Sequence, residues 1–514
     1  MSSWPPGLPT TLDYPEVPVG AILLGSARRY GARTAFAAGG VELSFAGLAD
    51  RAIRVANGLV ASGVKPGDRV ALRMPNCLEY PVAYFGALLA GAVFAPVNPL
   101  LPEPAAAAQI ADAGAVLTLT AADVPPLCLG QPGTPPAVDL DVRNDLAHLA
   151  YTGGTTGVSK GVRLPHRKVV VNALQYACWG TGSVPALDSE GGLVLDQVGP
   201  EEEWPVRLGS GIAINLTPWF HAMGTIAGLS VPVLTGTTLV LHGRLDPAQY
   251  LADAERLRVT SMGGAPALFA ALLACPDIGK RDLSSVRAIG SGAAPMPVEM
   301  SRRLHDLAPD AVISEGYGLT EVTMGATGGP THRSGLRKIG TVGVPIFDTE
   351  IRISGGDGDR GEVCIRGPQV MTGYHNRPDA TAEVLVDGWL HTGDIGTVDA
   401  DGYLSIVDRM KDMLLYKGYN VYPREIEELL AAHPGVLAAA VVGRPDPAVG
   451  ELPVAFVVRA RPDLADTELM AAVNDQLVPY KHLREIHFVD SIPVSAAGKI
   501  LKRELRTRLA QPKG

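Results

Sequence analysis

The chain of 514 residues is too long for a single hydrophobic core, and its length predicts roughly two to four domains. Hydrophobic residues make up 46% of it and charged residues 19%, which is typical of a globular protein and excludes a disordered one. The net charge of −9 offers no basic surface for nucleic acid. The five cysteines are widely separated and no two have the spacing of metal ligands, so we expect reduced thiols in a cytoplasmic protein.

The N-terminus begins Met-Ser-Ser-Trp-Pro-Pro-Gly, with neither a basic start nor an apolar stretch, so we expect no signal peptide. The longest apolar run, residues 82–97, is too short and too rich in glycine to cross a bilayer comfortably. We expect it to form a buried helix that leads into a buried strand, and we expect no membrane span. The sequence leaves open whether the protein is a monomer or a homodimer.

Apolar residues at helical and strand spacing alternate along the chain. They predict helices over 45–62, 79–90 and 104–113, and strands over 69–72, 93–97, 116–120, 212–216, 238–241 and 261–263. Alternation of this kind predicts a parallel sheet covered by helices. Residues 181–211 interrupt the pattern and are rich in Gly, Pro, Glu and Asp, which indicates a solvated insertion or a lid.

From about residue 340 short alternating strands follow one another, at 351–353, 362–366 and 403–407, and predict an antiparallel β subdomain. After it, the pattern predicts a small α/β unit with helices over 423–432 and 467–477 and strands over 437–442, 454–458 and 485–488. The predicted fold class is therefore α/β. We expect a large N-terminal domain (1–408) of parallel α/β subdomains plus the small β subdomain (about 340–408), a hinge (409–412) and a mobile C-terminal α/β domain (413–514).

Glycines, threonines and one lysine crowd into residues 152–161. Glycine lets the backbone approach a ligand closely, hydroxyls donate hydrogen bonds, and Lys160 adds a mobile positive charge, so the loop suits a polyphosphate. Its spacing differs from G-x-x-x-x-G-K-[ST], which argues against an ordinary P-loop ATPase. A plain surface turn is the alternative interpretation. The candidate residues of this loop are Thr152, Gly153, Gly154, Thr155, Thr156, Gly157 and Lys160.

Four further segments stand out in chain order, at 314–321, 391–394, 409–419 and 493–500. In the first, Tyr317 could stack on a flat base and Glu321 offers an oxygen ligand for Mg²⁺ bound to phosphates. In the second, Asp394 follows a glycine turn and can accept hydrogen bonds from ribose hydroxyls. Taken singly, each has a plainer interpretation: a surface ion pair for Glu321, a turn residue for Asp394 and a solvated charge for Lys499.

In their order, these segments resemble the motifs of the adenylate-forming superfamily, which contains acyl- and aryl-CoA synthetases, nonribosomal peptide adenylation domains and beetle luciferases. The resemblance runs from about residue 20 to residue 508 and includes the segments 66–70, 91–93 and 290–295. It implies an AMP-forming acid–thiol ligase that uses ATP, Mg²⁺ and coenzyme A. Such an enzyme joins a small carboxylic acid to AMP and then passes the acyl group to a thiol.

The resemblance also implies roles for individual residues. The loop at 152–160 would hold the β- and γ-phosphates of ATP, while Lys411 would be the hinge residue. Catalytic roles fall to Lys499, Thr320, Glu321 (the Mg²⁺ ligand) and His221. The remaining nucleotide- or cofactor-binding residues are Ala293, Ala294, Pro295, Gly316, Tyr317, Asp394, Arg409, Lys417 and Gly418. The acyl pocket would be formed by Trp219, His221, Gly264, Ala265, Gly290 and Gly292.

The chain departs from the family pattern in the phosphate loop, where Gly153 stands in place of the usual Ser. This change removes one hydroxyl donor, worth about 1 kcal/mol if it contacts phosphate. Three alternatives therefore stay open beside the CoA ligase: transfer to a carrier-protein thiol, action mainly on a preformed acyl-adenylate, and a non-catalytic binding protein. The glycine-rich pocket segments carry little bulk and no obvious cation, which favours an aryl, alicyclic or other bulky apolar acid.

Overall fold

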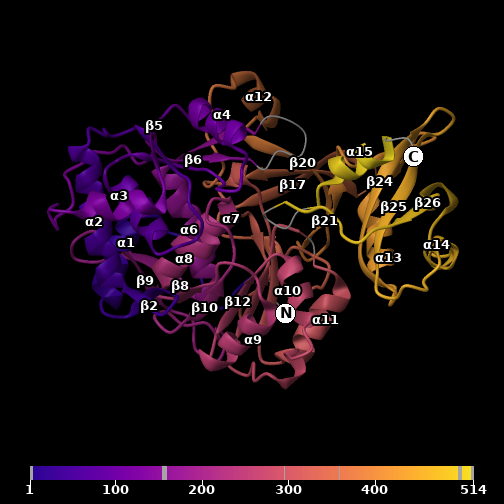
Figure 1. Ribbon diagram of the computed structural model, residues 1–514, viewed down its shortest axis with the longest axis horizontal. Coiled ribbons are helices and arrows are strands. Elements are labelled where there is room, and N and C mark those ends of the chain that lie inside the picture. The colour runs from indigo at the N-terminus through magenta and orange to yellow at the C-terminus, as the bar shows by residue number, and fades with distance from the viewer. Residues whose placement is uncertain (1–3, 153–158, 295, 358, 496–499, 511–514) are drawn as a thin grey trace.

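The computed structural model (Figure 1) describes residues 4–152, 159–294, 296–357, 359–495 and 500–510. The predicted alternation of helices and strands is confirmed, and it builds two separate sheets, in agreement with the expected parallel α/β subdomains. Two further sheets, each of five strands, follow in the later part of the chain. Among the described residues, no helix is both long enough and apolar enough to cross a membrane.

The largest sheet has nine strands in the order β16-β15-β14-β13-β12-β10-β11-β1-β2. Neighbouring strands from β1 to β14 run parallel, and antiparallel pairs close both edges. Its strands are β1 (Thr34–Ala38), β2 (Val41–Ser44), β10 (Ile212–Asn215), β11 (Thr238–Leu241), β12 (Ser261–Gly264), β13 (Ala288–Ser291), β14 (Val312–Tyr317), β15 (Thr327–Gly328) and β16 (Val344–Pro345). The helices that follow β10 to β13 are α7 (Ala222–Thr225), α8 (Val231–Thr235), α9 (Pro247–Arg256), α10 (Pro266–Leu273) and α11 (Val298–Leu307).

A second, five-stranded sheet has the order β5-β3-β4-β6-β7, and its first four strands run parallel. These strands are β3 (Arg69–Leu72), β4 (Val93–Pro96), β5 (Ala115–Leu119), β6 (Leu146–Tyr151) and β7 (Gly161–Pro165). The associated helices are α1 (Gly20–Tyr30), α2 (Phe45–Ala61), α3 (Glu79–Leu89), α4 (Glu103–Ala113), α5 (Val124–Cys128) and α6 (His166–Thr181). The apolar run at 82–97 forms the buried end of α3 and all of β4, as predicted.

The segment 181–211 is not the solvated insertion that its composition predicts. It forms a hairpin of β8 (Ser183–Leu187) and β9 (Leu193–Gln197), and Trp204 behind the hairpin is fully buried. Gly182 and Gly199 leave room for the Trp204 ring, because a Cβ on either would lie 2.4 or 2.3 Å from it. Arg28 on α1 also forms an ion pair of 2.7 Å with Asp188. The glycines of this segment therefore allow close packing around Trp204, and they do not indicate a solvated loop.

The predicted antiparallel strands after residue 340 are present as a sheet in the order β17-β18-β20-β19, with β21 paired to β20. Its elements are β17 (Glu350–Asp357), β18 (Arg360–Arg366), α12 (Pro378–Val384), β19 (Leu385–Val386), β20 (Trp389–Val398) and β21 (Leu404–Arg409). In Figure 1, this sheet lies between the larger part of the molecule and the C-terminal unit.

The C-terminal unit has its own sheet, in the order β23-β22-β25-β24 with β26 on β25, and its own buried core. Its elements are β22 (Leu414–Tyr416), β23 (Tyr419–Val421), α13 (Pro423–Ala431), β24 (Val436–Asp446), β25 (Gly450–Arg459), α14 (Asp466–Asn474), β26 (Glu485–Phe488) and α15 (Lys502–Ala510). Arg424 joins this unit to β21, because its backbone N–H donates to Asp408 Oδ2 at 3.0 Å and its guanidinium donates to the Ile406 carbonyl. Burial raises the pKa of the Asp408 carboxyl.

Candidate active site

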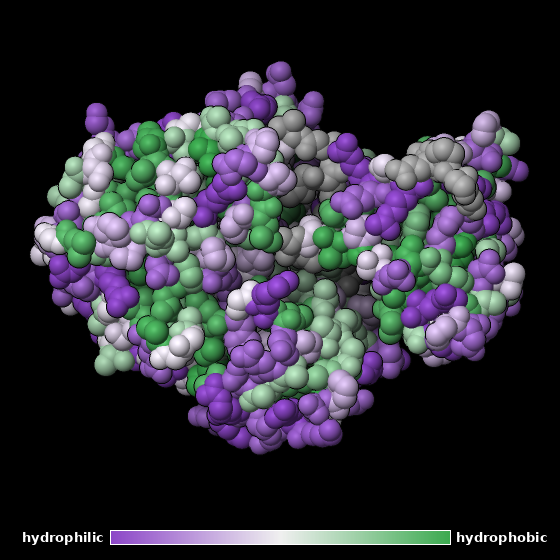
Figure 2. Space-filling model, in the orientation of Figure 1, coloured by the Kyte–Doolittle hydropathy of each residue, from purple (hydrophilic) through white to green (hydrophobic). Residues whose placement is uncertain are grey.

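A cavity of about 1330 Å³ opens where the parallel strands of the nine-stranded sheet end. The carboxyl ends of parallel strands are the usual place for ligands in α/β folds. Asn215, Gly264 and Tyr317 line the cavity from the ends of β10, β12 and β14. Thr392 and Arg409 line it from the antiparallel sheet. Figure 2 shows the surface hollowed between the larger part of the molecule and the C-terminal unit.

One end of the cavity gathers residues suited to phosphates. The Thr152 hydroxyl accepts the backbone N–H of Lys160 at 3.2 Å, and this bond closes the base of the loop. Lys160 Nζ lies 4.7 Å from the centre of the Tyr374 ring. The Tyr374 hydroxyl in turn donates to Glu321 Oε1 at 2.7 Å. Two candidate residues far apart in the sequence, Lys160 and Glu321, thus meet through a tyrosine that sequence reasoning missed.

Glu321 fits the predicted magnesium site in its chemistry. Its carboxylate lines the cavity, and a hard oxygen ligand beside phosphates is what Mg²⁺ prefers. Burial, followed by the neighbouring Glu321 charge, raises the pKa of Tyr374, so that phenol stays a hydrogen-bond donor. Thr320 precedes Glu321 in a short 3₁₀ turn (Thr320–Val322) and also lines the cavity. Thr323 follows with a φ of 68°, a strained conformation that tends to persist at functional sites.

A second group lies on the adjoining wall, at the junction of three elements. Asp394 on β20 is opposite Arg409 on β21, and Arg409 Nε lies 3.2 Å from Asp394 Oδ1. The Tyr317 hydroxyl donates to Asp394 Oδ2 at 2.6 Å. Asp394 is 4% exposed. Burial raises the pKa of the Tyr317 phenol well above its usual value, and the negative charge of Asp394 raises it further. The structure therefore brings together the residues that the resemblance assigns to adenine and ribose.

The backbone around the predicted adenine site is unusual. Ala293 has a φ of 66°, which an alanine rarely adopts, and it lines the cavity together with Gly316. A Cβ at Gly316 would lie 2.9 Å from the Thr327 carbonyl oxygen, so glycine is required there. Ala294 is not among the described residues that line the cavity. Lys411, the predicted hinge residue, does line it, and burial lowers the pKa of its amine.

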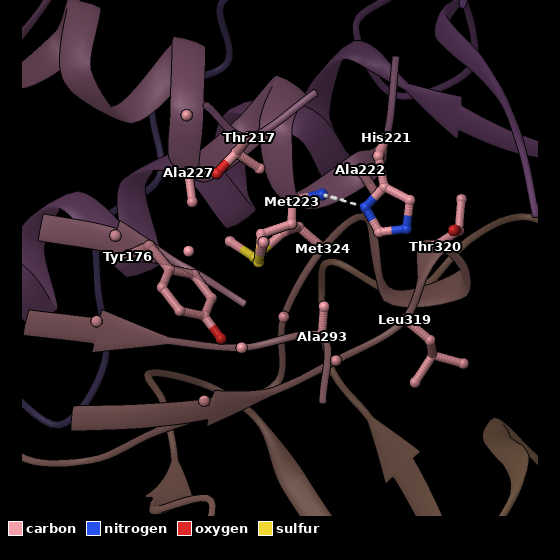
Figure 3. Close-up of a pocket in the computed structure, with 18 of the residues that line it drawn as sticks. Tyr176, Thr217, His221, Ala222, Met223, Ala227, Ala293, Leu319, Thr320 and Met324 are labelled. Atoms are coloured by element: carbon pink, nitrogen blue, oxygen red, sulfur yellow. Dashed lines mark hydrogen bonds between the residues drawn. The ribbon is translucent and has the colours of Figure 1, made fainter. Parts of the chain in front are cut away.

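At the other end of the cavity the walls are formed by apolar residues, several of which have very small side chains or none (Figure 3). Gly264, Gly290 and Gly292 line it, as predicted. A Cβ at Gly290 would meet nothing within 4 Å, whereas one at Gly292 would lie 3.3 Å from Met223 Sδ. His221 caps the start of α7, and its Nδ1 accepts the Met223 N–H at 3.4 Å. In Figure 3, Tyr176 and His221 lie on opposite sides of Met223.

Two of the predicted pocket residues do not line the cavity. Trp219 is fully buried in the core, with its ring centre 5.7 Å from that of Phe36 and 5.3 Å from that of Tyr80. Its indole N–H donates to the Gly228 carbonyl at 2.8 Å, which fixes the ring in this position. The prediction for Trp219 is wrong because packing decides where so large a side chain lies. Ala265 lies outside the cavity wall because it is the residue from which α10 begins.

The remaining predicted residues fall into two groups. Lys417 and Gly418 form the turn between β22 and β23, with φ values of 50° and 83°, and neither is among the described lining residues. The others lie outside the described residues: Gly153, Gly154, Thr155, Thr156, Gly157, Pro295 and Lys499. Ser495 and Leu501, on either side of the segment 496–499, both line the cavity.

Glu315 is a half-buried acid in the cavity wall that sequence reasoning named only as part of a motif. Its Oε2 accepts the Met296 N–H at 3.0 Å. Burial raises the pKa of this carboxyl from its usual 4.5 to about 7, although Arg424 acts in the opposite direction. The folded protein therefore holds the Glu315 proton more tightly than the unfolded chain does between these two values.

Because of this proton, the contribution of Glu315 to the free energy of unfolding should fall as pH rises from 4.5 towards 7. We expect Glu315→Gln to remove that loss. The variant should be about as stable as the wild type at pH 5 and more stable at pH 8, by up to roughly 3 kcal/mol. Urea unfolding at both pH values measures the difference. Exposed Glu299→Gln is the control, and parallel profiles for the wild type and Glu315→Gln would contradict the assignment.

Sequence comparisons agree with this geometry. The profile of the family described as AMP-binding enzyme matches residues 24–375, and that of the AMP-binding enzyme C-terminal domain matches residues 425–499. The fold is thus that of adenylate-forming enzymes. The chain belongs to the AMP-binding enzyme family and is an AMP-forming acid–CoA ligase that uses ATP and coenzyme A.

Individual proteins resemble this chain over nearly its whole length. The feruloyl-CoA synthase of Amycolatopsis sp is 39% identical, with 92% of this chain and 96% of that protein covered. The 4-coumarate–CoA ligase 5 of Oryza sativa subsp. japonica is 35% identical, with 92% and 90% covered. The crystal structure of the anthranilate CoA ligase AuaEII with anthranoyl-AMP superposes with a TM-score of 0.84 at 25% identity, and covers 98% of both chains.

Proposed function

We propose that the enzyme activates an aryl, alicyclic or other bulky apolar carboxylic acid as an acyl-adenylate and transfers the acyl group to coenzyme A. The observation that carries this proposal is the glycine-lined, apolar end of the cavity beside Met223. The names of the related feruloyl-CoA synthase, 4-coumarate–CoA ligase and anthranilate CoA ligase support an aromatic acid.

The cations of the cavity argue against a second carboxylate on the substrate. The lysines and arginines among its described lining residues all belong to the nucleotide end. Lys160 lies over Tyr374, and Arg409 pairs with Asp394. Arg377 forms an ion pair of 3.0 Å with Asp112. Lys411 follows two residues after Arg409. No cation of this set remains beside Met223 to hold a distal carboxylate.

The chemistry explains why cations crowd the nucleotide end. In the first step, a carboxylate oxygen of the substrate attacks the α-phosphorus of ATP, and pyrophosphate leaves. Both partners are anions, so Lys160, Arg409 and the predicted Lys499 would reduce their repulsion and stabilise the departing charge. Bound Mg²⁺, held by Glu321 and the phosphates, would supply further positive charge. In the second step, the thiolate sulfur attacks the acyl carbonyl carbon, and AMP leaves.

The two steps need different neighbours around the same carbonyl group. In the first step, Lys499 must lie beside this group. In the second step, the thiol of coenzyme A needs a channel to it. We infer that the C-terminal unit turns about residues 409–412 between the steps. The position of Lys411 in the cavity wall and of Arg424 across the junction supports this inference.

A panel of carboxylic acids tests the substrate. We expect CoA-dependent AMP formation to be fastest with aryl acids and slow with acetate and dicarboxylic acids. Gly290→Leu should fill the open space of the pocket and lower kcat/KM for a bulky aryl acid by about tenfold or more, the discrimination available from one hydrophobic contact. The same change should leave a short unbranched acid nearly unaffected.

Gly279→Leu is the matched control, because a Cβ there also meets nothing within 4 Å but the residue does not line the cavity. It should keep the wild-type order of substrates. A clear preference of the wild type for acetate or for a dicarboxylic acid would overturn the proposed substrate class, while the ligase activity itself would stand.

A further inference from the structure

Three side chains with different ligand atoms meet on one face of the antiparallel sheet, outside the nucleotide cavity. Cys364 on β18 is directly opposite His391 on β20, and Glu362 lies two residues before Cys364. Residues two apart on a strand point to the same face, so all three project together. One carboxylate oxygen, the thiol sulfur and a ring nitrogen all lie within 4.8 Å of one another.

The sulfur–nitrogen distance within this group matches that around a metal ion. Cys364 Sγ lies 3.5 Å from His391 Nδ1. A tetrahedral zinc ion with its usual bond lengths to sulfur and nitrogen places these two atoms about 3.5 Å apart. Glu362 Oε2 lies 2.7 Å from the same nitrogen. That hydrogen bond would lengthen to about 3.4 Å when both atoms become ligands.

We propose that Glu362, Cys364 and His391 form a binding site for a thiophilic divalent cation such as Zn²⁺, with water in the fourth position. Thiolate and imidazole ligands favour zinc over magnesium, so this site is distinct in its chemistry from the magnesium site at Glu321. On binding, the thiol proton of Cys364 passes to solvent and a sulfur–metal bond forms. The proton that His391 Nδ1 donates to Glu362 also leaves, and exchange with solvent places a proton on Nε2, so that the Nδ1 lone pair can bind the metal. The half-buried Glu362 and His391 provide the entry path, since Cys364 itself is fully buried.

Neighbouring groups shift the pKa of the Cys364 thiol in opposite directions. Burial and the neighbouring Glu362 raise the pKa of Cys364, whereas Arg352 lowers it. Arg352 is opposite Cys364 on β17 and stacks on Trp389 at 4.5 Å. Metal binding must displace the thiol proton, so the site favours cations that bind sulfur strongly.

The site adjoins the turn that carries Asp394. Glu362 Oε1 accepts the Gly393 N–H at 2.9 Å, and the Thr392 hydroxyl donates to the Val363 carbonyl at 2.7 Å. A cation that shifts the Glu362 carboxylate as it binds acts on this turn directly, because the other oxygen of that carboxylate holds the Gly393 N–H. Metal binding and nucleotide binding are thus expected to influence each other's affinity, and this linkage must be reciprocal.

Cobalt(II) tests the site because it replaces zinc and reports thiolate ligation by absorption. Metal-free full-length protein should bind one equivalent of Co²⁺ with a sulfur-to-metal charge-transfer band, and Zn²⁺ should displace it. Cys364→Ala should lose the band. His391→Gln and Glu362→Gln should weaken metal binding by about tenfold or more. Thermal unfolding without metal shows whether each variant is folded.

Cys77→Ala is the control, since it removes a partly buried thiol elsewhere and leaves the three ligands in place. It should keep both the band and the stoichiometry. The proposal is overturned if the wild type shows no thiolate band, or if folded Cys364→Ala and His391→Gln bind Co²⁺ as the wild type does. None of these readouts requires ATP or acid turnover.

Discussion

Lys499→Ala is expected to slow adenylation by about 10²- to 10³-fold while thioester formation from a supplied acyl-adenylate continues nearly unchanged. Removal of a group that stabilises developing charge in the transition state has an effect of this size. In the proposed mechanism the residue acts only in the first step, in which pyrophosphate departs. Ser495 and Leu501, which flank the segment 496–499, line the cavity and support this assignment. Pyrophosphate exchange into ATP measures the first step, and CoA-dependent AMP release from acyl-adenylate measures the second.

Lys280→Ala provides the matched control, because Lys280 is exposed and pairs with nearby Asp277. It should alter neither half-reaction. An equal loss of both half-reactions in Lys499→Ala would contradict a role confined to adenylation. If the wild type itself forms thioester from acyl-adenylate but exchanges no pyrophosphate with any acid, the enzyme acts mainly on preformed adenylates. Gly153→Ser, which restores the usual hydroxyl, would then be expected to recover exchange.

Asp394→Asn is expected to raise KM for ATP and to lower kcat/KM for ATP by about a hundredfold. The carboxylate accepts the Tyr317 hydroxyl and pairs with Arg409, and in the proposed complex it would also accept the ribose hydroxyls. An amide of the same shape keeps the packing but removes the charge, which leaves Arg409 without its partner. The loss of a buried charged hydrogen bond is worth about 1.5–3 kcal/mol, in line with this change. Steady-state kinetics with varied ATP checks the result.

The control for Asp394→Asn is Asp399→Asn. Asp399 follows the same strand but pairs with Lys338 at the surface and does not line the cavity. Its replacement should change kcat/KM for ATP less than twofold or so, as is typical of exposed ion pairs. An unchanged KM for ATP in Asp394→Asn would remove this residue from the nucleotide site.

Local patterns were sufficient to predict most helices and strands, because burial on one or both faces imposes a period on the sequence. The apolar run at 82–97 became a buried helix and strand for this reason. The pairing of strands was not predictable in the same way. Neither the separation into two parallel sheets nor the hairpin at 181–211 has a local signature, since both depend on contacts between distant residues.

In the candidate site, too, some residues were predictable from the sequence and others depend on contacts between distant parts of the chain. Tyr317, Asp394 and Arg409 meet as the order of motifs suggested. Tyr374 escaped notice because its partner, Glu321, lies 53 residues away and no motif marks it. Trp219 was misplaced because an aromatic residue beside His221 fits a pocket and a core equally well in sequence. Only its burial against Phe36 and Tyr80 distinguishes the two.

The contacts of Arg424 with Asp408 and Ile406 have a consequence for coenzyme A. They bridge the proposed hinge, so a turn of the C-terminal unit must break them. Hydrogen bonds to a charged group are worth about 1.5–3 kcal/mol, which corresponds to a bias of roughly ten- to a hundredfold between two conformations. Most molecules would then occupy the arrangement described here before the thiol arrives. If coenzyme A binds after the proposed turn, its apparent affinity would be reduced by the same factor, because the cofactor would bind to a minor population.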